Sequence, residues 1–308
     1  HSFPTRRSSD LYNGSYKMNK RSKSINLFLI DGYVKGRIKC TIANWTGLVF
    51  KIPRIQVEDS KNREELKQTG VYFLFGSADD SEVDKDNVYI GQAGLRANGE
   101  GLLFRINEHK NDVSKDYWNE AVVVTTSNNS FGPTEISYLE NKLVMMAKHA
   151  NRYEVKNNVN PNKGNITEEK KSELEEFIEN LKLVIGTLGY KVFEDVINED
   201  DTDKSEPILF YKVKNIEARG KRTTEGFVLL KGSQISEIIK TKTKDLKKSV
   251  TAQREKYKND IKNNKLTHDI LFNSPSGAAK FVSGTSVNGM ICWKTKEGLT
   301  LQEITSKE

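Results

Sequence analysis

Two short apolar segments, residues 71–75 and 88–90, most constrain how this chain can fold. Both are rich in β-branched and aromatic residues, and a polar, acidic stretch separates them, so we expect two strands that pair antiparallel. Side chains alternate between the two faces of a strand, which points Tyr72 and Tyr89 away from their aliphatic neighbours. The pattern predicts two tyrosines projecting from one face of a sheet, either as half-buried strand residues or as parts of a site.

Two helices are expected downstream of these strands. The first, residues 102–110, carries Arg105 and His109, which are four residues apart and therefore share one face. They form either an ordinary surface pair or a phosphate clamp, because the guanidinium is a planar fork of donors.

The second helix begins near Pro133 and carries one carboxylate in an unusual place. Glu140 is four residues after Ile136 and three before Leu143, so it lies within or beside the apolar stripe. Burying an unpaired carboxylate is costly, and its partner is either a neighbouring Lys or Arg or a hard cation such as Mg²⁺. Glu135, in the first turn, is explained by the helix dipole alone.

The order and spacing of these residues resemble those of the GIY-YIG nuclease family. The two tripeptides of that family correspond here to Gly70-Val71-Tyr72 and Tyr89-Ile90-Gly91, and Arg105 and Glu140 follow in family order. The resemblance implies an α+β fold, with a small mixed or antiparallel sheet flanked by helices. Two departures are Val71 in place of Ile and the sequence Gln92-Ala93-Gly94 after the second tripeptide.

The resemblance also implies an activity, that of a metal-dependent endonuclease hydrolysing DNA phosphodiester bonds. Glu140 would be the metal ligand for Mg²⁺ or Mn²⁺, and Arg105 would bind the phosphate. Tyr72, helped by Tyr89, would orient or deprotonate the attacking water. A free phenol with a pKa near 10 is a poor base at neutral pH, and His109 is our candidate for relieving that mismatch.

An asparagine after the second helix completes the site in that family. Asn157 is our choice, while the neighbouring Asn158 and Asn160 leave the position ambiguous, and ordinary turn chemistry would also explain the cluster. Residues 167–188 read as a further amphipathic helix that Gly189 ends.

The segments around the predicted nuclease domain (residues 61–193) are assigned as follows. Residues 1–17 look like a non-native leader, with Met18 as a better start, and residues 18–60 form an N-terminal β segment. In that segment we expect a two-residue hairpin at Asp31-Gly32, followed by a strand from Val34.

Residues 194–206 hold seven acids and one lysine and read as an acidic linker. Residues 207–308 are expected to form a basic α+β domain. Its expected elements are a hairpin around Gly220, a Lys-rich helical stretch over 236–265, a helix from Ser274-Pro275 to Gly284 and a strand over 290–294. Residues 272–294 resemble an uncharacterised domain that is often fused behind GIY-YIG nucleases.

Charge and composition indicate the partner. The net charge is +7, and residues 221–269 alone hold 13 Lys/Arg against 6 Asp/Glu, leaving 36 of each sign elsewhere. Such a block is either a solvated helix face or a polyanion-binding surface. DNA is the expected partner, with RNA left open. Double-strand cleavage would call for a homodimer or for two separate visits by one molecule.

The expected compartment follows from the hydropathy and the cysteines, and two rival functions stay open. No apolar run approaches the roughly 20 residues of a membrane span, so no membrane partner is expected. Cys40 and Cys292 stand far apart, which fits a reducing cytoplasm. The rival functions are a non-catalytic nucleic-acid-binding protein on a nuclease scaffold and a protein-interaction adaptor.

Overall fold

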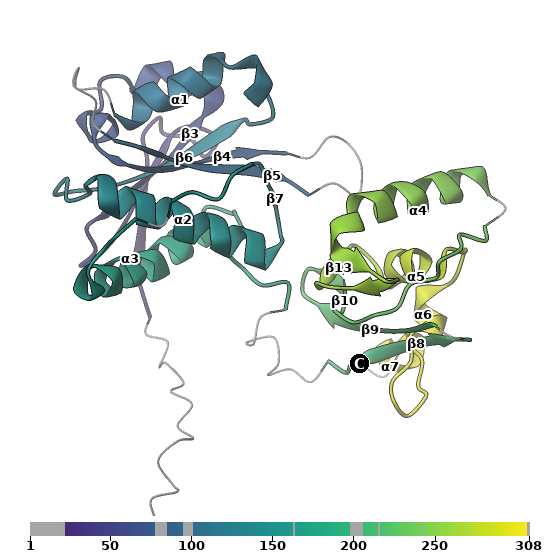
Figure 1. Ribbon diagram of the computed structural model, residues 1–308. Coiled ribbons are helices and arrows are strands. Elements are labelled where there is room, and N and C mark those ends of the chain that lie inside the picture. The colour runs from purple at the N-terminus through teal and green to yellow at the C-terminus, as the bar shows by residue number, and fades with distance from the viewer. Residues whose placement is uncertain are drawn as a thin grey trace, which may run out of the picture.

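The structure is a computed structural model that describes residues 22–77, 85–94, 101–162, 164–197, 206–214, 216–241 and 243–306. The predicted leader and Met18 lie outside these residues, as does most of the predicted acidic linker. The fold is mixed α+β, as the sequence predicted, and its described residues form a seven-stranded sheet, a four-stranded sheet and a two-stranded hairpin (Figure 1). The two larger sheets are packed into separate hydrophobic cores.

The N-terminal sheet has seven strands in the order β1-β2-β3-β6-β4-β5-β7. Their bounds are β1 Ile25–Leu29, β2 Ile38–Ile42, β3 Gly47–Pro53, β4 Gly70–Gly76, β5 Asn87–Ala93, β6 Glu120–Thr126 and β7 Glu154–Val155. Neighbouring strands pair antiparallel except β5 and β7, which are parallel. Because β3 pairs with β6 along its whole length, the strands of the N-terminal segment continue the sheet that carries the tyrosines.

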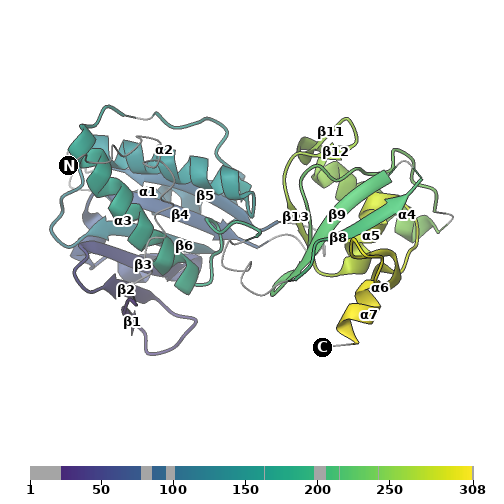
Figure 2. The ribbon, with the colours of Figure 1, turned by 90° about the horizontal axis from the view of Figure 1, so that it is seen from below.

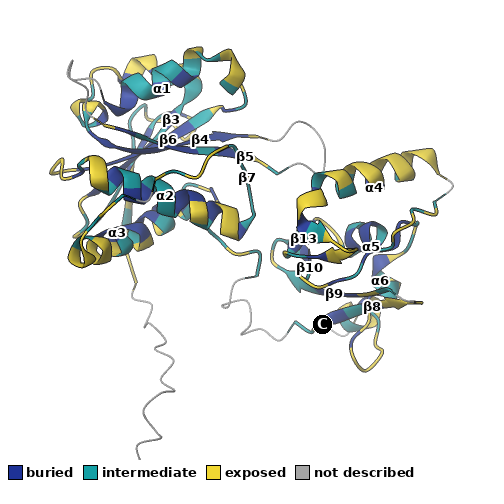
Figure 3. Ribbon diagram, in the orientation of Figure 1, coloured by how far each residue is buried: buried dark blue, intermediate teal, exposed yellow. Residues whose placement is uncertain are grey.

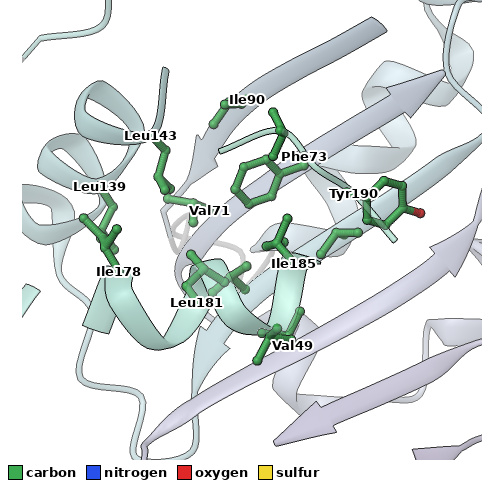
Figure 4. Close-up of a cluster of buried hydrophobic side chains, with 14 of the residues drawn as sticks. Val49, Val71, Phe73, Ile90, Leu139, Leu143, Ile178, Leu181, Ile185 and Tyr190 are labelled. Atoms are coloured by element: carbon green, nitrogen blue, oxygen red, sulfur yellow. The ribbon is translucent and has the colours of Figure 1, made fainter. Parts of the chain in front are cut away.

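Helices cover both faces of this sheet. The helix α1 (Leu102–Asn111) lies on one face, and α2 (Pro133–Ala150) and α3 (Glu168–Thr187) lie on the other (Figure 1). Alternation along β4 supplies both cores, since Val71 and Phe73 pack beneath α2 and α3 while Tyr72 and Leu74 pack with α1. Figure 4 shows the core beneath α2 and α3.

The hairpin expected at Asp31-Gly32 is wrong in detail, because β2 begins at Ile38, four residues later than predicted. The Asp31 carboxylate instead organises a longer turn by accepting from the backbone N–H of Arg37 at 2.8 Å and from its guanidinium. These bonds to Arg37 lower the pKa of Asp31 to about 2. A side chain that bonds across the turn thus replaces the two-residue loop.

The C-terminal unit is built on a four-stranded sheet of order β13-β10-β9-β8 (Figure 2). Its strands are β8 Leu209–Val213, β9 Ile216–Thr223, β10 Gly226–Leu229 and β13 Ile270–Phe272, with a small hairpin of β11 Ile261–Lys262 and β12 Lys265–Leu266. Its helices are α4 Lys244–Lys256, α5 Pro275–Ser283, α6 Gly289–Cys292 and α7 Leu301–Thr305. Phe227, Phe281 and Trp293 are fully buried at its centre.

The hairpin predicted around Gly220 is wrong, since Gly220 lies inside β9 and pairs with Leu209 and Leu229. The turn into β10 comes later, at Thr223–Gly226. A Cβ on Gly220 would lie 2.3 Å from the Phe227 ring, so the glycine leaves space for an aromatic side chain and does not make a turn.

The helical stretch predicted over residues 236–265 is too long. Only Lys244–Lys256 is α-helical, and the chain then forms the β11–β12 hairpin. Asn263 and Asn264 take positive φ angles of 50° and 57° at its turn, the backbone that a two-residue primed turn requires.

The strand predicted over residues 290–294 is also wrong, because residues 289–292 form the helix α6. The Asn288 side chain accepts from the Met290 N–H at 3.0 Å, so it caps a helix instead of leading into a strand. The helix predicted from Ser274-Pro275 to Gly284 is confirmed as α5, with Ser274 as its cap and Gly284 at φ 68°.

Ion pairs join the two units. Arg152 follows α2, and its two terminal guanidinium nitrogens, Nη1 and Nη2, donate to the Glu225 carboxylate at 2.9 and 2.8 Å. Lys191 lies 3.2 Å from the same carboxylate. None of the described helices is long and apolar enough to cross a membrane.

Candidate active site

The two tyrosines lie on the same face of the sheet, as predicted. In the antiparallel register of β4 and β5, Tyr72 pairs with Gly91 and Leu74 pairs with Tyr89. The two tyrosines therefore stand one diagonal step apart, with ring centroids separated by 6.2 Å. Tyr72 is 1% exposed, whereas Tyr89 is only half-buried.

The glycine that closes the second tripeptide leaves room for the Tyr72 phenol. A Cβ on Gly91 would lie 2.4 Å from the Tyr72 hydroxyl and 2.5 Å from Cζ, closer than any real contact allows. The tyrosine ring therefore folds across the partner strand where that strand has no side chain.

Replacing Gly91 by alanine is expected to push the Tyr72 ring out of place and to destabilise the protein by about 1–3 kcal/mol. Urea unfolding measures the loss. Gly94→Ala is the matched control, because its new Cβ would lie 3.9 Å from Ile136, an ordinary contact. Equal stability of the two variants would contradict the tight fit at Gly91.

A buried hydrogen-bond chain runs from Tyr72 to the end of α1. The Tyr72 hydroxyl lies 2.6 Å from Nε2 of His109, which is 2% exposed. On the other side of the imidazole, Nζ of Lys115 lies 2.7 Å from Nδ1. Burial, followed by the charges of Lys115 and Arg105, lowers the pKa of His109 to about 4, so the ring is neutral at pH 7.

Arg105 lies one helical turn before His109 and faces the same tyrosine. Its charge acts on Tyr72, and its Nη1 donates to the Glu108 carboxylate at 2.6 Å. The Arg105 side chain is 40% exposed, so its remaining donors face solvent. Arg105 is thus held by Glu108 while it stays accessible to an anion.

Glu140 reaches the site from α2. Leu139 and Leu143 beside it are fully buried in the core, and Glu140 is half-buried. Burial raises the pKa of Glu140 to about 7, against the opposing effects of a hydrogen bond with Gln92 and the charge of Arg105. The carboxylate also acts electrostatically on Tyr89, whose pKa it raises. Glu140, Arg105 and the tyrosine pair therefore lie within electrostatic reach of one another.

An open groove of about 660 Å³ connects these groups to solvent. Tyr89 and Glu140 line it, whereas Tyr72 does not. The other lining residues are Ser114, Lys115, Tyr117, Lys156 and residues 157–161. With two lysines and a single carboxylate, the groove suits an anionic ligand.

The asparagine cluster separates into different roles. Both polar atoms of the Asn157 amide bind the main chain of Ile90, with Oδ1 accepting at 3.1 Å and Nδ2 donating at 2.7 Å. Asn160 also lines the groove, and its Oδ1 accepts from Lys148 at 2.8 Å. Asn157 therefore ties the 156–161 segment to β5 and shapes the groove, and it does not act through free amide atoms.

The donor set bears on whether a metal fits. No group of three or more His, Cys, Asp or Glu side chains comes together within the described part of the chain. A site for Mg²⁺ or Mn²⁺ would thus rest on Glu140 alone. Mg²⁺ keeps several waters and is often held by one or two carboxylates plus substrate phosphates, so a single half-buried carboxylate in an open groove fits that ion.

Sequence reasoning missed Lys115 and Gln92, both of which contact predicted site residues. Lys115 lies six residues after His109, beyond the end of α1, and no helical spacing connects them. Only the short turn at Val113–Lys115 brings the lysine back to the imidazole. The Asp112-Val113-Ser114 turn signal was the one available hint.

Comparison with known proteins identifies only the second unit. No curated protein and no solved structure matches this chain. The nuclease resemblance of residues 70–160 has no family match behind it and stays a prediction. Residues 209–305 match the family model described as a domain of unknown function (DUF4357). This match confirms the predicted resemblance of the C-terminal unit to an uncharacterised domain.

Proposed function

We propose that residues 61–193 form a GIY-YIG-type endonuclease domain that hydrolyses DNA phosphodiester bonds with Mg²⁺ or Mn²⁺. The observation that carries the proposal is that Tyr72, Tyr89, Arg105 and Glu140, from four elements, lie within electrostatic reach of one another beside a groove that Tyr89 and Glu140 line. Each contributes a different part of phosphodiester hydrolysis.

Arg105 supplies the phosphate clamp, because its exposed donors can pair with two oxygens of one phosphate. Glu140 holds the metal, which when bound would neutralise charge on the phosphate and the leaving oxygen. A tyrosine hydroxyl orients the attacking water. Asn157 shapes the groove by tying the 156–161 segment to the main chain of Ile90.

Nicking of supercoiled plasmid by the full chain tests this proposal. Cleavage that requires Mg²⁺ or Mn²⁺ and stops with EDTA supports it. Salt-dependent binding without cleavage, on DNA and RNA and with both metals, would replace it with the non-catalytic nucleic-acid-binding protein. Absence of binding would favour the protein-interaction adaptor.

The C-terminal unit is proposed to add nucleic-acid affinity through α4. Val250 is the buried residue of this helix, and its outer face is exposed (Figure 3). Lys244, Lys247 and Lys248 are exposed on it, and none forms an ion pair with another described residue. Unpaired lysines on one face are available for phosphates.

Changing Lys244, Lys247 and Lys248 together to glutamine is expected to weaken DNA binding at low salt. Each lost phosphate contact should reduce the slope of log K against log salt by about 0.9. Fluorescence anisotropy over a salt series measures that slope. The control changes Lys170, Lys171 and Lys182 of α3 to glutamine, the same loss of charge. An equal effect in both variants would show that net charge, and not α4, sets the affinity.

A further inference from the structure

Lys115 occupies a position that the proposed mechanism does not yet use. It ends the short turn after α1, where the Asp112 side chain accepts from the Ser114 N–H at 3.0 Å and from the Ser114 hydroxyl. From there Nζ of Lys115 reaches Nδ1 of His109 at 2.7 Å. It also lies 4.6 Å from the centroid of the Tyr89 ring, a position that favours a charged ammonium.

The chemistry of these groups fixes the proton on His109. A lysine ammonium has three donors and no acceptor, so Nδ1 of His109 must accept and carries no hydrogen. A neutral imidazole with a bare Nδ1 has its hydrogen on Nε2. That hydrogen then points to the Tyr72 hydroxyl, 2.6 Å away.

The same logic sets the direction of the next bond. The Tyr72 oxygen accepts from His109, and the positive charge of Arg105 also acts on it. A hydrogen pointing at either group is unfavourable, so the Tyr72 hydrogen must go elsewhere. The Tyr89 ring lies on the same face, one diagonal step away with its centroid 6.2 Å from that of Tyr72, so the Tyr89 hydroxyl is the acceptor that we assign.

We propose that Lys115 is a positioning residue that holds His109 as the Nε2–H tautomer, which directs the hydroxyl of Tyr72 to donate to Tyr89. The hydrogen bonds then run in one direction, from Lys115 through His109 and Tyr72 to Tyr89. The catalytic meaning of this chain rests on the proposed nuclease function, whereas the tautomer does not.

The direction of these hydrogen bonds gives the two tyrosines different roles. Tyr89 lines the groove beside Glu140 and can meet a water there, whereas Tyr72 is 1% exposed and stands behind it. Burial and the charge of Glu140 raise the pKa of Tyr89, so it acts as a neutral hydroxyl, which accepts from Tyr72 and can donate its own hydrogen to a water in the groove. Tyr89 is thus the catalytic phenol in place of Tyr72, and His109 is a donor, not the group that takes the tyrosine proton.

The tautomer can be read directly by long-range ¹H–¹⁵N NMR on the full chain labelled at histidine nitrogens. His109→Asn assigns the signals among the four histidines. We expect the Nε2–H pattern for His109 in the wild type and in Lys115→Arg, and a shift towards Nδ1–H in Lys115→Met. The control is Lys110→Met, which removes a lysine 3.7 Å from Glu58 and should leave the pattern unchanged. An Nδ1–H wild type, or an unchanged pattern in Lys115→Met, would overturn the proposal.

Plasmid nicking adds the catalytic readout. Lys115→Met is expected to lower kcat at least tenfold, beyond any rise in KM from the lost groove charge, and Lys115→Arg to recover most of kcat. A wild type that nicks while Lys115→Met nicks equally well would sink the positioning role alone. A wild type that never nicks would remove the nuclease function, and the NMR result would still decide the tautomer.

Discussion

Replacing Glu140 by glutamine should abolish cleavage and yet make the protein more stable above pH 7. If Glu140 is the metal ligand as proposed, its loss would remove several kcal/mol of transition-state stabilisation, about a 1000-fold or greater loss in nicking rate. The stability gain has a separate cause, because burial raises the pKa of Glu140 to about 7 from its ordinary value of 4.5.

The direction of the pH effect follows from proton binding. The folded protein holds the Glu140 proton more tightly than the unfolded chain does. The contribution of Glu140 to the free energy of unfolding is therefore greatest below pH 4.5 and is lost as the pH rises through about 7. Glutamine removes this loss, a gain of about 1–3 kcal/mol at pH 8. Urea unfolding without metal, at pH 4 and pH 8, measures the difference, and Mg²⁺ should stabilise only the wild type.

Glu135→Gln is the matched control on the same helix. Glu135 caps α2 by accepting from the Gly132 N–H at 3.1 Å and lies outside the groove. Its replacement should leave cleavage unchanged and should not raise stability at pH 8. Undiminished nicking by Glu140→Gln would show that Glu140 is not the metal ligand.

Arg105→Ala is expected to lower kcat for nicking about 100- to 1000-fold, the usual effect of removing one preorganised donor to a developing charge. Stability should change little, because the side chain is 40% exposed and its ion pair with Glu108 lies near solvent. Single-turnover nicking measures the rate, and thermal unfolding checks the fold.

Two further variants sharpen the test of Arg105. Arg105→Lys keeps the charge but loses the planar fork, so it should recover only part of the rate. Glu108→Gln removes the ion-pair partner and leaves the clamp in place, so it should remain active. If Arg105→Ala nicked as fast as the wild type, the phosphate-clamp role would be wrong.

Local patterns predicted the part of the fold that holds the candidate site. The period of two along β4 and β5 placed both tyrosines on one face, and the period of 3.6 placed Arg105 with His109 and Glu140 beside the core. These relations depend on residues close in sequence, so the sequence alone contains them.

Contacts between distant residues could not be read in the same way. Gly220 was predicted to lie at a turn, because the Phe227 ring that needs its empty space belongs to another strand. Lys115 could not be linked to the site from the sequence, because its contact with His109 depends on the course of a short turn. The different burial of Tyr72 and Tyr89 likewise depends on how α1 and the 156–161 segment border the sheet.

The mounting of Glu140 has a consequence for how such a site changes over time. Its neighbours Leu139 and Leu143 are packed into the core beneath the sheet (Figure 4). The distance from the carboxylate to the tyrosines is therefore set by the volume of those buried side chains, and close-packed cores transmit small changes in volume. A conservative core substitution would displace the carboxylate by a fraction of an ångström. Substitutions in the core could thus change the reactivity of the groove while every residue lining it stayed the same.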